Sequence, residues 1–210
     1  LLNGGKSESY AIVPDYYNGI LPTVVAKVGE KVKAGSVLMI DKNRPEIKFV
    51  SPVSGEVTAV NRGEKRKVLS IVVKPDAQIE YEEFGKKNVA SLQGAEVKEV
   101  LLNAGMWPFI KQRPYDIVAA PLDTPRDIFV SAFYSAPLAP NFDFIVKGQE
   151  ADFQTGLNAL AKLTNGKVYV GVRSGSVVSG VKGVEIVEVE GPHPAANVGV
   201  QINHIKPVNK

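Results

Sequence analysis

One short phrase occurs twice in the first third of the chain. Val28-Gly29-Glu30-Lys31 and Arg62-Gly63-Glu64-Lys65 each lead into a run of alternating apolar residues. Short alternating runs are typical of strands that bury one face, and the glycines mark the turns between them. The repeat therefore predicts two similar halves, related by a quasi-twofold axis, that close over a small shared core.

The spacing of this repeat resembles the biotinyl/lipoyl carrier fold, the barrel-sandwich hybrid. Carriers of that fold display a modifiable lysine at the tip of the hairpin between the halves. Here the hairpin, residues 41–48, reads Asp-Lys-Asn-Arg-Pro-Glu-Ile-Lys, which puts Arg44-Pro45 at the tip and Lys42 and Lys48 beside it. We predict a carrier fold kept as a rigid scaffold, with a carrier modified on Lys42 or Lys48 as the alternative.

The composition excludes several functional classes. A chain of 210 residues with 44% apolar residues is long enough for one or two globular domains. The formal charge of +3 is small and evenly mixed, so nucleic acid is not an expected partner. One basic cluster, at residues 62–67, lies at a predicted hairpin and is interpreted as a solvated turn.

The chain has no cysteine, which excludes disulfides and cysteine-ligated metal or iron–sulfur centres. Its two histidines, His193 and His204, have no carboxylate at helical spacing and make a poor metal site. No apolar run approaches the ~18 residues of a membrane-spanning helix, and the N-terminus shows no signal-peptide pattern. We therefore expect a soluble, cytoplasmic protein, and the abrupt start at Leu1 indicates a fragment.

The pattern changes after a charged stretch at residues 81–88, which we interpret as a linker. Helical spacing follows over residues 95–104, with Gly105 at the position of a C-terminal cap, and again over 153–163, ending at Asn165-Gly166. Strand-like runs are expected at 115–120, 127–133, 142–146, 167–172 and 184–189. Strand, helix and strand in that order predict a parallel α/β sheet.

The strong nucleotide-binding and nucleophile motifs are missing from this second part. The nearest substitute is the loop at residues 172–176, whose backbone N–H groups would form a small anion nest beside Arg173; a plain strand-to-helix turn is the competing interpretation. Aromatic residues concentrate at Trp107-Pro108-Phe109 and at Arg113-Pro114-Tyr115, where packing in a core competes with ligand binding. The loop at residues 123–126 and the aromatic turn at 15–19 are further candidates for lining a ligand-binding cleft.

Further phrases along the whole chain resemble a single family. They are Leu21-Pro22-Thr23 leading into residues 28–32, then residues 41–49, 61–66, 102–107 with Arg113-Pro114, 156–169, and 191–195. The family they resemble is NqrA, a component of the sodium-translocating NADH:quinone oxidoreductases.

The resemblance implies three domains. They are a barrel-sandwich hybrid over 1–84, a Rossmann-like α/β domain over 85–183 similar to the flavin-binding subunit of respiratory complex I, and the start of a further β-rich domain over 184–210. The family lacks the glycine-rich flavin loop, and this sequence lacks it too. We therefore expect no FMN, iron–sulfur cluster, metal or covalently bound group in this chain, and no complete catalytic site.

The same resemblance implies a peripheral protein on the cytoplasmic side of a bacterial inner membrane, whose partners are the other subunits of the complex and ubiquinone. A quinone head group needs an aromatic slot and one or two hydrogen-bond donors at its carbonyls. By residue type, the candidates are Tyr16, Tyr17, Trp107, Phe109, Arg113 and Tyr115. A purely structural assembly component with no ligand is the alternative to this role.

Overall fold

The structure, a computed structural model, describes residues 4–208 and divides the chain into two compact units. The first unit comprises Leu1–Lys86 and Glu99–Ala120, and the second comprises Lys87–Lys98 and Pro121–Lys210. The division falls inside helix α1 (Gly94–Asn103). Residues 99–120 therefore pack with the first unit, which differs from the continuous second domain that the sequence predicts over 85–183.

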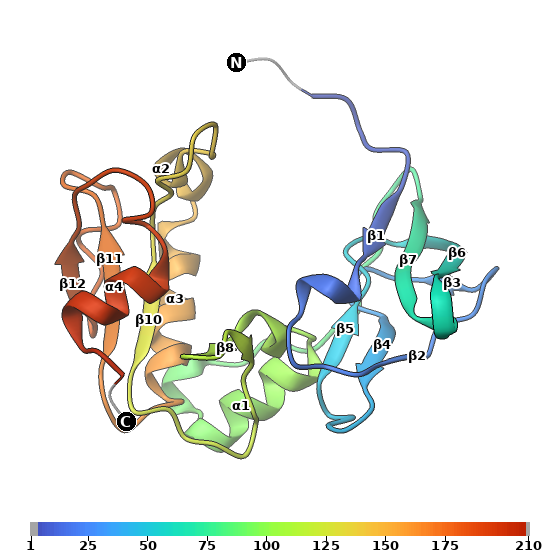
Figure 1. Ribbon diagram of the computed structural model, residues 1–210, viewed down its shortest axis with the longest axis horizontal. Helices are drawn as coiled ribbons and strands as arrows, with labels where there is room; N and C mark the ends of the chain where they lie inside the picture. The colour runs from blue at the N-terminus through green and yellow to red at the C-terminus, as the bar shows by residue number, and fades with distance from the viewer. Residues whose placement is uncertain (1–3, 209–210) are drawn as a thin grey trace. The chain divides into compact units, whose positions relative to one another are not determined.

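The first unit is built from short antiparallel strands (Figure 1). One sheet has the order β1-β7-β6-β3 and another β2-β4-β5, while β8 and β9 form a separate pair. The strands are β1 (Tyr10–Ile12), β2 (Pro22–Val24), β3 (Lys31–Val32), β4 (Val37–Asp41), β5 (Lys48–Val50), β6 (Gly55–Arg62), β7 (Val68–Pro75), β8 (Lys111–Gln112) and β9 (Ile117–Val118). Three-residue 3₁₀ turns lie at η1 (Pro14–Tyr16), η2 (Glu64–Arg66) and η4 (Trp107–Phe109). These sheets confirm the predicted barrel-sandwich hybrid.

The two copies of the repeated phrase both precede strands, but they turn the chain differently. Gly29 has a positive φ of 86° just before β3, a conformation that glycine adopts without strain. In the second copy Gly63 has a negative φ, and Lys65 and Arg66 carry the positive values instead. The two copies therefore differ in the backbone conformation of their turns, and the strands that follow differ in length, two residues in β3 and eight in β7.

Strands β4 to β7 supply most of the core of the first unit. Burial alternates along β5 and the first part of β6, as the period-two pattern predicts, whereas Leu38 and Met39 of β4 are both buried beside a register shift. The most deeply buried large side chains of this unit are Leu38, Met39, Ile47, Phe49, Val57, Ile71 and Val73, together with Val118 of β9. Four of these eight come from the segment between Leu38 and Phe49, so the hairpin that a carrier would project into solvent is here packed at both of its strands.

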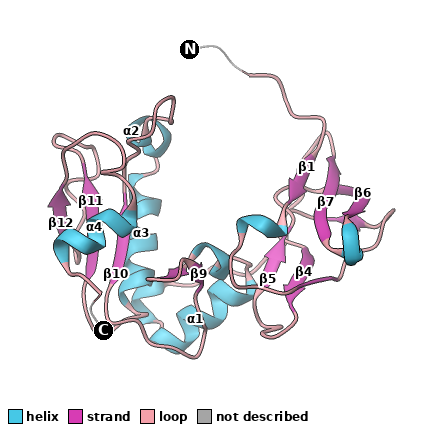
Figure 2. Ribbon diagram, in the orientation of Figure 1, coloured by secondary structure: helices cyan, strands magenta, loops and turns pink. Residues whose placement is uncertain are grey.

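The second unit contains a parallel sheet with the order β10-β11-β12, which confirms the predicted α/β class. Its elements are η3 (Val89–Ser91), β10 (Ile128–Ser131), α2 (Phe142–Val146), α3 (Glu150–Ala161), β11 (Val168–Val172), β12 (Glu185–Glu188) and α4 (Val198–Ile205). Helices α2 and α3 form the connection between β10 and β11, as expected for a parallel pair (Figure 2).

Helices cover both faces of this sheet. Val168, Val170 and Val172 of β11 pack in one apolar cluster with Leu157 of α3. Because successive strand residues point to opposite faces, Gly171 faces the other side, where a Cβ would collide with Gln201 of α4. The sheet is thus the middle layer of three.

Two expectations for this unit were wrong. Residues 142–146 form helix α2 and not a strand, because the Asn141 side chain caps the helix by accepting a hydrogen bond from the Phe144 N–H at 3.1 Å. An apolar-polar-apolar run of five residues fits either period, so the cap decides. Residues after 184 do not open a separate β-rich fold: β12 extends the same parallel sheet and α4 packs on β10.

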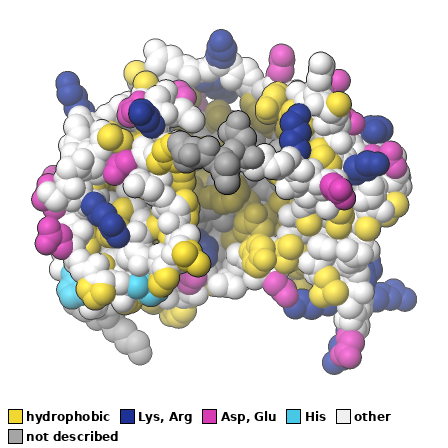
Figure 3. Space-filling model, turned by 90° about the horizontal axis from the view of Figure 1, so that it is seen from above, with side chains coloured by type: hydrophobic (Ala, Val, Ile, Leu, Met, Phe, Trp, Pro, Cys, Tyr) yellow, Lys and Arg dark blue, Asp and Glu magenta, His cyan; other side chains and the backbone are white. Residues whose placement is uncertain are grey.

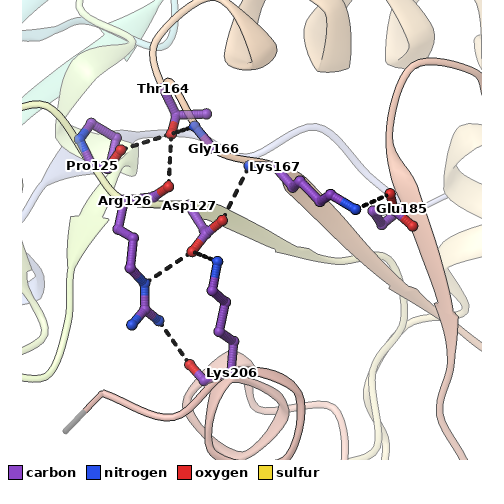
Figure 4. Close-up of polar contacts among 8 residues, drawn as sticks. All are labelled: Pro125, Arg126, Asp127, Thr164, Gly166, Lys167, Glu185 and Lys206. Carbon is purple, nitrogen blue, oxygen red and sulfur yellow. Dashed lines mark hydrogen bonds and ion pairs between the residues drawn. The ribbon is translucent and has the colours of Figure 1, made fainter.

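A buried carboxylate joins the start of β10 to the end of α4 (Figure 4). The Asp127 side chain is 1% exposed, and one of its oxygens accepts from Arg126 Nε at 2.9 Å and from Lys206 Nζ at 2.7 Å. The other oxygen accepts the Lys167 backbone N–H at 3.1 Å. Burial alone would raise the pKa of the Asp127 carboxyl, but Lys206, Lys167 and Arg126 together hold that pKa below its ordinary value.

Candidate functional site

Arg44, at the tip of the β4–β5 hairpin, binds other parts of the first unit. Its Nε donates to Asp41 Oδ2 at 2.8 Å, and its two terminal nitrogens donate to the carbonyl oxygens of Val118, at 3.2 Å, and Gly19, at 3.0 Å. Asp41 is fully buried and also accepts the Leu21 N–H. A planar guanidinium with five fixed donors suits this three-way contact, which lysine cannot reproduce.

The lysines that flank the hairpin tip are not presented as a carrier's lysine would be. Lys48 Nζ donates to Asn103 Oδ1 at 2.8 Å, and Lys42 lies beside the anchored tip rather than on it. The hairpin is held down at the position where a swinging arm needs to be free. The geometry supports the scaffold interpretation over the carrier one.

Arg44 also positions the aromatic turn that precedes β2. The hydrogen bond to Gly19 and the contact of Asn18 O with the Val118 N–H, at 2.9 Å, hold residues 16–19 against β9. Tyr17 then packs edge-on to Phe49, with ring centroids 4.7 Å apart, and to Phe109 at 6.3 Å. Partial burial raises the pKa of the Tyr17 hydroxyl above its ordinary value, so this hydroxyl stays protonated and able to donate.

Trp107 is a core residue, as the packing interpretation of its motif predicts. Its side chain is 4% exposed, and its indole N–H donates to Ala119 O at 2.8 Å. The neighbouring Phe109 is instead 67% exposed. The short η4 turn thus places one aromatic ring inside the first unit and one ring of the same motif in solvent.

Arg113 lies in the β8–β9 connection and has an incomplete set of partners. Its Nη2 is 3.2 Å from Asp116 Oδ1, yet among the described residues its buried Nε has no hydrogen-bond partner. Tyr115, between them, is 75% exposed, as is Tyr16 of η1. Buried donors are almost always satisfied in proteins, so the Arg113 Nε is an unusual group on this connection.

The structure therefore separates the six predicted site residues. Tyr17 and Phe109 are in aromatic contact, Trp107 lies buried two residues from Phe109, and Tyr16, Arg113 and Tyr115 lie on segments joined to them through Asn18 and β9. Sequence reasoning missed Phe49 as the partner of Tyr17, because an apolar residue within a strand gives no signal beyond burial. It also missed the anchoring role of Arg44. The available signal was that an arginine stands at the hairpin tip, where a carrier has its lysine.

The remaining candidate features belong to the second unit. The loop after β11 does not lead into a helix, and Arg173 lies over the Phe133 ring and donates to the Tyr134 carbonyl oxygen. The loop at residues 123–126 packs against Thr164, whose hydroxyl donates to Pro125 O at 2.7 Å. Within residues 4–208, no three His, Asp or Glu side chains gather closely enough to hold a metal ion.

The surface carries no basic stripe on the face drawn in Figure 3, where lysines and arginines are scattered among acidic side chains. None of the helices that the structure describes combines the length and the apolar character needed to cross a bilayer. A barrel-sandwich hybrid with an immobilised hairpin, followed by a three-layer α/β unit, defines a class of protein that keeps a carrier fold without the carrier's lysine.

Comparison with known families identifies the chain further. Residues 1–76 match the NqrA N-terminal barrel-sandwich hybrid domain, and residues 92–210 match the NqrA second alpha/beta domain. The chain belongs to the NqrA family.

Its relatives are named as the A subunit of Na(+)-translocating NADH-quinone reductase. The chain is 37% identical to the protein of Photorhabdus laumondii over 99% of its length, 39% identical to that of Hahella chejuensis over 99%, and 38% identical to that of Vibrio anguillarum over its full length. It spans about half of these relatives, 47%, 47% and 48% of their respective lengths.

Proposed function

We propose that this chain acts as a peripheral component of a sodium-translocating NADH:quinone oxidoreductase, docks on the membrane subunits from the cytoplasmic side, and contributes to quinone binding. The observation that carries the proposal is the similarity over the whole chain to proteins named as the A subunit of that reductase. The catalytic centres of such a complex would lie on other subunits, and this chain would supply structure and ligand contacts.

The aromatic group around Tyr17 supports the quinone part of the proposal. A quinone ring is flat and apolar, and it stacks on aromatic side chains with one exposed face. Phe109 offers such a face, because its ring is largely exposed and is steadied by Tyr17. We assign the Tyr17 hydroxyl and the Arg113 guanidinium as hydrogen-bond donors for the quinone carbonyls, and Tyr16 and Tyr115, both largely exposed, as further aromatic contacts.

The single tryptophan gives a direct binding assay. We expect a short-chain ubiquinone to quench Trp107 fluorescence saturably, because Trp107 lies two residues from Phe109 and the indole is held rigidly by Ala119. Phe109→Ala should weaken binding about tenfold, the usual effect of removing one stacking ring. The titration needs inner-filter correction and a competing quinone-site inhibitor.

Tyr81→Ala is the matched control, because Tyr81 is 68% exposed and lies beside Ala34 rather than Tyr17. Its dissociation constant should stay within about twofold of the unaltered chain. Linear, non-competable quenching would remove the quinone role and leave the assembly role, whereas equal saturable binding by both variants would remove Phe109 from the proposed site. The assembly role would then be tested by whether loss of this component prevents the complex from forming.

A further inference from the structure

The three parallel strands of the second unit end at the same edge of their sheet. Strand β10 ends at Ser131, β11 at Val172 and β12 at Glu188. In open α/β sheets, ligands bind in the crevice outside the carboxyl ends of the strands. The side chains that follow these ends therefore decide what this edge can bind.

Two consecutive residues after β10, Tyr134 and Ser135, are each contacted by a nitrogen-bearing side chain from another strand end. Arg173, directly after β11, donates from Nη2 to Tyr134 O at 3.0 Å. His193, after β12, has its Nδ1 3.2 Å from the hydroxyl of Ser135. Residues from all three strand ends thus converge at positions 134 and 135.

Ser135 bridges the backbone and the histidine. Its hydroxyl oxygen accepts the Ala196 N–H at 3.0 Å, and its own proton is available for donation to His193 Nδ1. When Ser135 donates in this way to the neutral imidazole, the ring proton lies on Nε2. In that tautomer His193 offers a second N–H donor at the edge where Arg173 contacts the adjacent residue, Tyr134.

Arg173 has donors to spare. Among the described residues its one hydrogen-bond partner is the Tyr134 carbonyl oxygen, and neither Arg173 nor His193 forms an ion pair. Arg126 of the same unit is by contrast bound to Asp127. The centroid of the Phe133 ring, a residue 6% exposed, lies 5.4 Å from the Arg173 guanidinium carbon, within the range of a cation–π contact.

We infer that this edge binds a phosphate group, held by the Arg173 guanidinium and the His193 Nε2–H. A tetrahedral phosphate directs its oxygens several ways and accepts from both side chains, whereas a planar carboxylate matches the guanidinium fork alone. The phosphate belongs either to a free phosphorylated small molecule or to a lipid headgroup. Neither source is needed for the quinone role of the first unit, so the two proposals stand or fall separately.

The test is a titration of the full chain with inorganic phosphate and with pyrophosphate, at fixed pH and ionic strength. NMR follows the ring signals of His193, which are told apart from those of His204 by comparison with the His193→Gln variant. Calorimetry measures the dissociation constant of each variant. We expect saturable shifts of the His193 signals. Arg173→Gln should weaken binding by at least about tenfold and His193→Gln by about threefold to tenfold, while Arg173→Lys should restore part of the loss because it keeps the charge without the fork.

Lys182→Gln is the matched control, because it removes one exposed positive charge from the same unit and should leave binding within about twofold. Sedimentation with phosphatidylcholine vesicles containing phosphatidic acid distinguishes the sources: Arg173-dependent vesicle binding indicates a headgroup, and its absence beside phosphate binding indicates a free ligand. Non-saturating shifts, or an equal loss in Arg173→Gln and Lys182→Gln, would overturn the inference. If Arg173→Gln folds poorly, His193→Gln and Arg173→Lys carry the test.

Discussion

Replacing Asp127 by alanine should lower the free energy of unfolding of the second unit by about 3 kcal/mol, the cost of leaving a buried charge network without its acceptor. The Asp127 carboxylate accepts from Arg126, Lys206 and the Lys167 backbone, and its side chain is 1% exposed. Removal would leave the Lys167 N–H unsatisfied and release the end of α4, whose Lys206 carbonyl also accepts from Arg126. Urea denaturation followed by circular dichroism measures the loss.

The pH dependence gives an independent check. The pKa of Asp127 is lower in the folded chain than in the unfolded one, so its contribution is fully present above the unfolded value of about 3.9 and is lost as pH falls through the folded value. Between these two pH values the unaltered chain should therefore lose stability as Asp127 is protonated, and Asp127→Ala, which lacks the carboxyl, should lose less. Lys167→Met, which breaks an exposed pair with Glu185, is the matched control and should cost less than about 1 kcal/mol. Equal losses in the two variants would contradict the buried network.

Replacing Asp41 by alanine should destabilise the first unit by about 3 kcal/mol, since it strips three donors of their shared acceptor. These donors are Arg44 Nε and the backbone N–H groups of Leu21 and Asn43. Arg44→Ala should cost a similar amount because it leaves Asp41 buried without its counter-ion and frees the Gly19 and Val118 carbonyls. Arg44→Lys should recover part of it.

Trp107 reports on the same anchor. Ala119, which accepts the indole N–H, follows directly after Val118, so loosening of β9 in Arg44→Ala should shift Trp107 emission to the red. The double variant Asp41→Ala/Arg44→Ala should lose less unfolding free energy than the two single variants lose in sum. The difference, which is the coupling energy, should be about 1.5–3 kcal/mol. Lys48→Ala on the same hairpin should change stability by less than about 0.5 kcal/mol. Additive losses would show that the two side chains act independently.

The parts of the fold that could be predicted from the sequence are those in which apolar residues recur at a regular spacing. Alternation marked the strands around Val57 and Ile71, and helical spacing marked α1 and α3, because burial of one face leaves a regular trace. The family resemblance, drawn from whole phrases, was confirmed by the match to both NqrA domains. The strand predicted at residues 142–146 was wrong because a single capping amide at Asn141 outweighed a five-residue pattern.

The candidate sites were less predictable because they depend on contacts between distant segments. Arg44 reaches Val118 across 74 positions, and Ser135 meets His193 across 58. No local pattern encodes such pairs. Aromatic residue types led to Tyr17 and Phe109, but exposure separates Phe109 from Trp107 within one three-residue motif, and only packing sets that difference.

The course of the chain through α1 bears on how this protein can be dissected. Residues 99–120 complete the unit begun by residues 1–86, and they supply the Val118 carbonyl for Arg44 and the buried Trp107. A fragment cut at the end of the sandwich would lose both, although its strands would be intact. Chimaeras between members of the family should therefore exchange residues 1–86 together with residues 99–120. The first unit is a discontinuous module, and residues 1–86 alone do not complete it.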